Sequence, residues 1–114
     1  ESSAHENFKN KIFEINEGDT RLILKKLIPV RMIRNTFFNR ITDAEESGAS
    51  RSELLHILGE GRSRKGIFEG DLEEGELEIG QVASLINKNQ SAAEIIEDII
   101  TTYKQAKDRI IKSE

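Results

Sequence analysis

The chain has 114 residues, the length of one small domain, so it can bury one modest core but not two. Charged residues make up 33% of the chain and the formal net charge is -4, which argues against a dedicated nucleic-acid binder, because phosphate contacts need a surplus of Lys and Arg. The chain has no Cys and no apolar run near the roughly 20 residues of a membrane span, which excludes disulfides and thiolate chemistry, argues against a membrane protein and favours the cytoplasm.

The first third of the chain predicts a helix followed by extended segments. Residues 3–6 have the Ser and Glu spacing of a capping box, and apolar residues then recur at helical spacing, so we expect a helix over about Ser3 to Asn16. Thr20 to Leu27 favours a short strand or an extended connector. Pro29, the only proline, disfavours helical geometry before it, and Val30 to Ile33 favours a continued extended path.

Two further helices are predicted in the middle of the chain, before a glycine-rich stretch. Asn35 or Thr36 can cap a helix that ends at Gly48, and Ser50 begins a second capping box for a short helix. Six of the eight glycines fall within residues 59–80, so we expect a long loop there with little regular structure. Loops of this length are usually functional or packed on another element.

The end of the chain predicts the most distinct helix. A short periodic run begins at Gly80-Gln81, and a third capping box, residues 91–94, begins a long terminal helix with a wide apolar face. Several Ile side chains on this face would each gain roughly 1.5 to 3 kcal/mol on leaving water, so the face needs a partner surface. Either the other predicted helices form a compact bundle with it, or it was built for a surface that this chain does not contain.

These elements predict a mainly α fold with four to five helices and at most a short strand pair. We divide the chain, as one domain or fragment, into a helix with an extended connector (1–34), a helical part with the glycine-rich loop (35–80) and the terminal helices (81–114). Residues 21–40 carry six cations and no acid, whereas residues 69–78 carry six acids. We interpret these stretches as solvated faces or as charge partners of each other.

Side chains suited to catalysis or metal binding are few. His5 and His56 have no second ligand at metal-binding spacing, so we interpret both as surface histidines, and the acidic run lacks the alternating order of an EF-hand calcium loop. Residues 61–66 contain the ingredients of a phosphate cradle without the order of a P-loop, which favours a flexible basic turn. The cations of this turn are candidate anion contacts: Arg62, Arg64 and Lys65. We predict no catalytic residue and no metal site.

Three motifs follow one another along the chain. Residues 1–5 read ESSAH, residues 29–35 read PVRMIRN, and residues 61–86 read GRSRKGIFEGDLEEGELEIGQVASLI. The third motif resembles the C-terminal signature of the FMN-dependent nitronate monooxygenases (2-nitropropane dioxygenases) and of the related enoyl-ACP reductase II enzymes. It shares their GR-x-(R/K)-K-G start, G-D-x-x-x-G centre and G-Q-x-x-x-L-I end. The first two motifs resemble the E-S-x-A-H sequence that follows the last barrel strand of these enzymes and their P-V-R-x-I-x-N segment.

The resemblance implies a TIM-barrel flavoenzyme in which FMN oxidises an alkyl nitronate with oxygen, or passes hydride from NAD(P)H to an enoyl thioester. Such a barrel takes roughly 250 residues, so the chain is expected to be its C-terminal fragment, a helical cap and the terminal barrel helix. The family's FMN-phosphate loops and catalytic histidine would precede Glu1. We therefore expect no bound FMN and no activity from this chain alone, with the missing barrel portion of its own enzyme as its partner. Gly80 and Gln81, a pair that the family keeps at the start of a helix, are the candidates to lie near substrate or cofactor at the barrel mouth.

Two other interpretations stay open. The apolar terminal helix also suits a self-contained helical interaction module, with a homodimer through that helix. The basic turn also suits phosphate or nucleotide binding. The residues do not distinguish nitronate oxidation from enoyl reduction, because the substrate pocket would lie mainly in the barrel.

Overall fold

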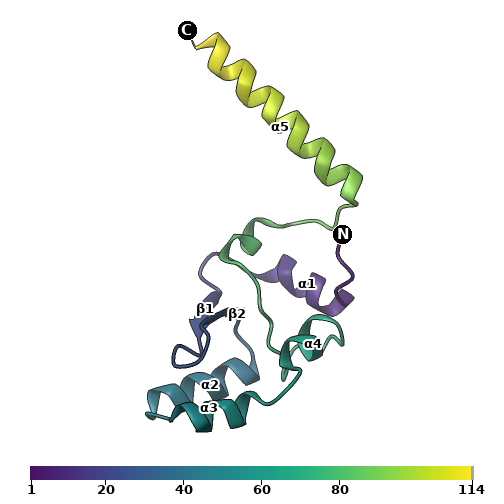
Figure 1. Cartoon of the computed structure of the whole chain (residues 1–114). Helices are drawn as coiled ribbons and strands as arrows, with labels where there is room; N and C mark the ends of the chain where they lie inside the picture. Colours follow the sequence, from purple (N-terminus) through teal and green to yellow (C-terminus); the bar gives the residue numbers. More distant parts are fainter. Residues whose placement is uncertain (114) are drawn as a thin grey trace.

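A long helix projects from a body of short helices and one hairpin in a computed structural model that describes residues 1–113 (Figure 1). In chain order the elements are α1 (Glu6–Glu14), β1 (Thr20–Ile23), β2 (Val30–Ile33), α2 (Thr36–Glu46), α3 (Arg51–Leu58), α4 (Arg62–Ile67), the 3-10 helix η1 (Gln81–Leu85) and α5 (Ala92–Lys112). The described residues extend 58 × 31 × 20 Å. The mainly helical fold with one strand pair is as predicted. Residues 1–91 are called the globular part below, in contrast to α5.

The hairpin places apolar residues on two sides, because adjacent side chains of a strand point to opposite faces. Strands β1 and β2 pair antiparallel, with Thr20 opposite Ile33. Met32 faces α2 and α3, in a cluster of buried side chains that contains Ile23, Leu24, Met32, Phe37, Phe38 and Ile41. Ile33 faces α1 and α4, in a second cluster that contains Phe8, Ile15, Ile33, Leu77 and Ala83. Each cluster combines side chains from segments 1–34 and 35–80, so these two segments fold as one unit.

The end of the glycine-rich stretch runs alongside β2. The amide of Ile33 donates to the carbonyl of Leu77 at 3.0 Å, and the amide of Ile79 donates to the carbonyl of Arg31 at 3.1 Å. These two bonds fix the position at which the chain leaves the hairpin and enters η1 at Gln81.

Three helix starts follow the sequence signals. Asn35 caps α2, since its side-chain oxygen accepts from the amide of Phe38 at 2.8 Å. Ser50 and Ser91 begin α3 and α5, and each forms a complete capping box with the Glu three residues later. These local signals satisfy amide groups that the first turn of a helix leaves without partners.

The predicted helix start at Ser3 is wrong. Helix α1 begins at Glu6, and its N-cap is His5, whose Nδ1 accepts from the amide of Asn7 at 3.1 Å. The amide of His5 donates to the carbonyl of Ile67 at 2.8 Å. This contact with the end of α4 holds the chain extended where the predicted first turn would lie.

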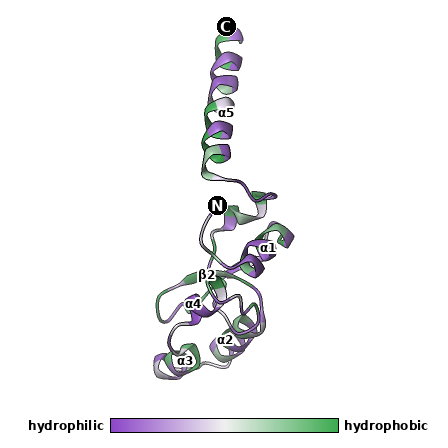
Figure 2. Ribbon diagram, turned by 90° about the vertical axis from the view of Figure 1, so that its right-hand side faces the viewer, coloured by the Kyte–Doolittle hydropathy of each residue, from purple (hydrophilic) through white to green (hydrophobic). Residues whose placement is uncertain are grey.

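Helix α5 does not join a bundle. None of its 21 residues, Ala92–Lys112, is buried. Figure 2 shows hydrophobic colour along one side of α5 and hydrophilic colour along the other. Of the two alternatives for the apolar face, the described chain therefore leaves the second, a face without a partner in residues 1–113. No described helix is long and apolar enough to cross a membrane.

Candidate functional site

The glycine-rich stretch contains a helix that the sequence did not predict. Helix α4 covers Arg62–Ile67, and Gly61 precedes it with a φ of 72°, a left-handed conformation that a side chain would disfavour. The helix packs closely against the chain at Gly75. A Cβ on Gly75 would collide with the Cα of Gly66, so only glycine fits there. The expected flexible basic turn is therefore an ordered helix, held by tertiary contacts rather than by apolar periodicity.

Arg62 links three parts of the globular part. Its guanidinium donates to the carbonyl of Leu58 at 2.9 Å, to the carbonyl of Glu74 at 2.8 Å and to a carboxylate oxygen of Glu74 at 2.9 Å. It also lies 4.7 Å from the ring centre of Phe37, within the range of a cation–π contact. This candidate anion contact therefore has protein partners on α2, α3 and the acidic run.

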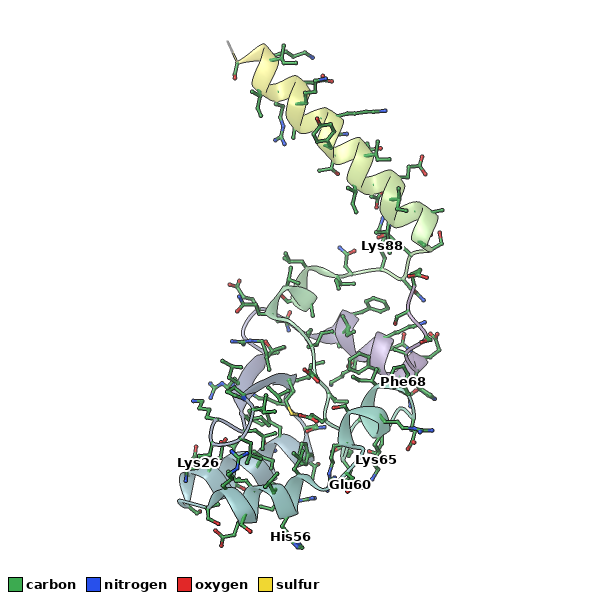
Figure 3. The ribbon with its side chains drawn as sticks, viewed as in Figure 1. Lys26, His56, Glu60, Lys65, Phe68 and Lys88 are labelled. Atoms are coloured by element: carbon green, nitrogen blue, oxygen red, sulfur yellow. The ribbon has the colours of Figure 1, made fainter. Side chains whose placement is uncertain are left out.

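Arg64 and Lys65 have carboxylate partners nearer the surface. Arg64 Nε lies 3.3 Å from Glu69 Oε1, and Lys65 Nζ lies 3.3 Å from Asp71 Oδ2. Figure 3 labels Lys65 on α4 and Phe68 just after it. An anion at this helix would have to displace these carboxylates, and anion contact by the three cations stays a prediction.

The acidic run has structural partners. Asp71 Oδ1 accepts from the amides of Glu73 and Glu74, and the Glu74 bond is the main cause that lowers the pKa of Asp71. Arg40 first, and then Arg62, lower the pKa of Glu74. The Arg40–Glu74 pair also joins the basic stretch to the acidic run, at 2.6 Å. Within residues 1–113, no group of three or more His, Asp or Glu side chains is arranged to hold a metal ion.

The two histidines lie apart. The ring of His5 packs over Gly70, where a Cβ would collide with it. His56 is exposed on α3 and points away from the body of the molecule (Figure 3). His5 is thus a helix cap, which the sequence did not indicate, and His56 is a surface side chain.

Gly80 and Gln81 lie at the start of η1, beside a surface groove. Both are exposed. The groove is lined by Gln81, Thr20, Arg31 and Leu85, among others, from the hairpin, the turn before it and η1. Arg31 Nη1 donates to the carbonyl of Thr20 at 3.0 Å and to its hydroxyl at 3.2 Å. Sequence reasoning did not single out Arg31; the available signal was a cation between apolar residues inside the PVRMIRN motif.

Three glycines of the signature, Gly66, Gly70 and Gly75, leave no room for the phosphate of a flavin. A phosphate cradle needs open glycine backbone or unpaired donors, but Gly66 and Gly75 face each other and Gly70 faces His5. No buried side-chain nitrogen or oxygen of residues 1–113 lacks a hydrogen-bond partner. Gly66, Gly70 and Gly75 of the signature therefore serve close packing.

Two solved structures are similar to this chain. The structure matches FabK from Thermotoga maritima with a TM-score of 0.85 and 30% identity, over 97% of this chain and 35% of that chain. It matches the FabK M276A mutant from the same organism with a TM-score of 0.79 and 27% identity, over 99% of this chain and 33% of that chain. The chain thus spans about a third of either FabK chain. No curated protein matches it by sequence.

The fold, mainly helical with one antiparallel strand pair, matches part of the TIM-barrel fold of FabK. The family model described as nitronate monooxygenase matches residues 1–102. The chain therefore belongs to the nitronate monooxygenase family, whose members are FMN-dependent in general.

Proposed function

We propose that this chain is the C-terminal cap and terminal helix of an FMN-dependent oxidoreductase, and that it acts only together with a barrel portion that precedes Glu1. The observation that carries this proposal is the family match over residues 1–102, in a chain that covers only a third of FabK. The uncovered apolar face of α5 supports it, since a helix with such a face needs a surface to cover.

In this proposal the barrel supplies FMN and the reacting groups, while the chain shapes the mouth of the site. Gly80 and Gln81 lie near the substrate or cofactor. Their support is the pairing of residues 77–79 with β2, which fixes the start of η1 on a rigid hairpin. The groove beside Gln81 offers the guanidinium of Arg31, which Thr20 positions, as a binding group for a polar part of a substrate.

Two reactions suit the relatives. Reduction of an enoyl thioester, with hydride passed from NAD(P)H through FMN, is favoured by the structural match to FabK, an enoyl-ACP reductase II. Oxidation of an alkyl nitronate with oxygen is the second candidate, and the family model favours it. In this proposal the chain binds FMN and substrate only when the barrel portion is present.

The test is co-expression of the 114-residue chain with the segment encoded upstream of it. We expect a one-to-one complex that contains FMN and either oxidises NAD(P)H with a short enoyl thioester or consumes oxygen with an alkyl nitronate. Gln81→Ala should raise the KM or lower the kcat of the complex without loss of FMN, whereas exposed Glu60→Ala, far along the chain, should change neither. Turnover by the chain alone, or a complex with neither activity, would contradict the proposal.

A further inference from the structure

The apolar side of α5 is wide, continuous and uncovered. At about 100° per residue, its apolar residues occupy an arc of about 160° around the helix, wider than the stripe of about 100° on an ordinary surface helix. The large members of the arc are between 37% and 68% exposed: Ile95, Ile96, Ile99, Ile100, Tyr103, Ile110 and Ile111. A surface of this kind on an isolated chain is a protein-binding surface.

Two charges of opposite sign lie along one edge of this arc. Glu97 and Lys104 are seven residues, about two turns, apart and so share that edge. Neither forms a salt bridge within residues 1–113. A second α5 in the opposite direction would place Lys104 beside Glu97, and by symmetry the same pair would form twice.

We propose that two copies of the chain pair antiparallel through α5, with the midpoint of the pairing between Thr101 and Thr102. This midpoint is close to the middle of Ala92–Lys112, so nearly the whole length of both helices overlaps. In this register Ile100 faces Tyr103 of the second copy. Two large-to-small contacts flank this pair: Ile99 with Ala106, and Ala93 with Ile110.

The register also gives a position to Lys107, the one cation inside the arc. It faces Ile96 of the second copy, where its carbon stem can cover apolar surface while the ammonium reaches solvent. The apolar arc and the charges at its edge therefore agree on the same register.

A parallel pair is disfavoured by the shape of the chain. The globular part lies at the N-terminal end of α5 (Figure 1), so a parallel pair would bring both globular parts to one end. It would also put the edges that carry Glu97 and Lys104 on opposite sides of the pair, so neither charge would meet its opposite in the second copy. The antiparallel pair separates the globular parts by about 30 Å, the length of a 21-residue helix.

The dimer proposal does not rest on the proposed oxidoreductase and can be tested separately. Both use the same face of α5, so a second copy and the barrel portion would compete for it. If both proposals hold, the upstream segment converts the dimer to a one-to-one complex; if only the dimer holds, that segment leaves the dimer intact.

Sedimentation equilibrium of the 114-residue chain should give twice the chain mass. Glu97→Lys and Lys104→Glu should each weaken the dimer about tenfold, because each single change puts like charges together at both symmetric positions, and the double variant should restore the affinity to within about threefold. Asp98→Lys makes the same acid-to-base change one residue along, on the opposite side of the helix, and should leave the affinity within about threefold. Circular dichroism must show equal helix content in all four variants.

Spin labels on single introduced cysteines test the direction of pairing. Labels at Thr101→Cys should lie close together, whereas labels at Lys112→Cys should lie about 30 Å apart along the helix axis. A parallel pair would bring both sets of labels close. A monomer, an assembly larger than two, a parallel label pattern or a double charge variant that stays weak would each overturn the proposal.

Discussion

Apolar side chains of the globular part contact one another, whereas those of α5 face solvent. In the globular part, Met32, Phe37, Ile41, Leu54 and Leu77 are fully buried. In α5 the structure is local, a capping box followed by a helix of 21 residues. The same kind of sequence pattern, periodic apolar residues after a Ser cap, thus ends in a packed core in one region and in an open surface in the other. The difference means that the two regions should respond differently to the same mutation.

The largest contrast is expected for the same exchange in both regions. Ile41→Ala removes a fully buried side chain and should lower the free energy of unfolding of the globular part by about 2–5 kcal/mol. Ile99→Ala, at a side chain 62% exposed, should change it by less than about 0.5 kcal/mol and instead weaken binding to whatever covers α5. Amide exchange of α2 during urea unfolding measures both. Equal losses would contradict the separation of the two regions.

Arg62 and Arg64 should differ in the same way within α4. Arg62→Met leaves the carbonyls of Leu58 and Glu74 without their charged donor and should cost about 2–3 kcal/mol. Arg64→Met removes only an exposed ion pair and should cost less than about 0.5 kcal/mol. Both can be measured by urea unfolding. If the two variants are equally stable, Arg62 does not link α2, α3 and the acidic run.

The two capping boxes give a smaller contrast. Ser50→Ala should lower the stability of the globular part by about 1 kcal/mol, because α3 packs within it. Ser91→Ala removes the equivalent cap from α5 and should reduce helix content without changing unfolding of the globular part. Circular dichroism and amide exchange separate these results. Loss of stability in the globular part from Ser91→Ala would show that the two regions are coupled.

The smallest effect is a pH dependence through Glu74. Arg40 and Arg62 hold the pKa of Glu74 below its ordinary value of 4.5, so its ionised form stabilises the fold above that value. This contribution is lost as the pH falls through the lowered folded-state pKa. Glu74→Gln should therefore be less stable than the unmodified chain at neutral pH and lose less stability on acidification below 4.5. Urea unfolding at both pH values measures this, with Glu60→Gln as the control, and parallel pH profiles for all three chains would contradict it.

Local signals allowed much of the fold to be predicted from the sequence. Asn35, Ser50 and Ser91 begin helices because their side chains and immediate neighbours satisfy the first turn, and no distant contact is needed. Extended segments on both sides of Pro29 were also expected, but the pattern of residues 30–33 did not separate a strand from a helix. The uncovered face of α5 was one of the two outcomes that its apolar pattern left open.

Features that depend on distant contacts were missed. Residues 62–67 have no apolar period, and α4 forms there because Arg62 and Gly66 find partners around Glu74 and Gly75. Ser3 fails as a helix start because Ile67 holds His5 extended. The groove at Gln81 depends on the pairing of Ile79 with Arg31, which no local pattern announces. Part of the motif that resembles the family thus serves packing, at Arg62, Gly66 and Gly75.

The most direct measurement is the flavin spectrum of the purified chain before and after addition of the segment encoded upstream of it. We expect a colourless chain when alone and, after mixing, a stable one-to-one complex with one FMN per complex. Stoichiometric FMN on the 114-residue chain alone would contradict the proposal, as would an upstream segment that forms no complex with the chain.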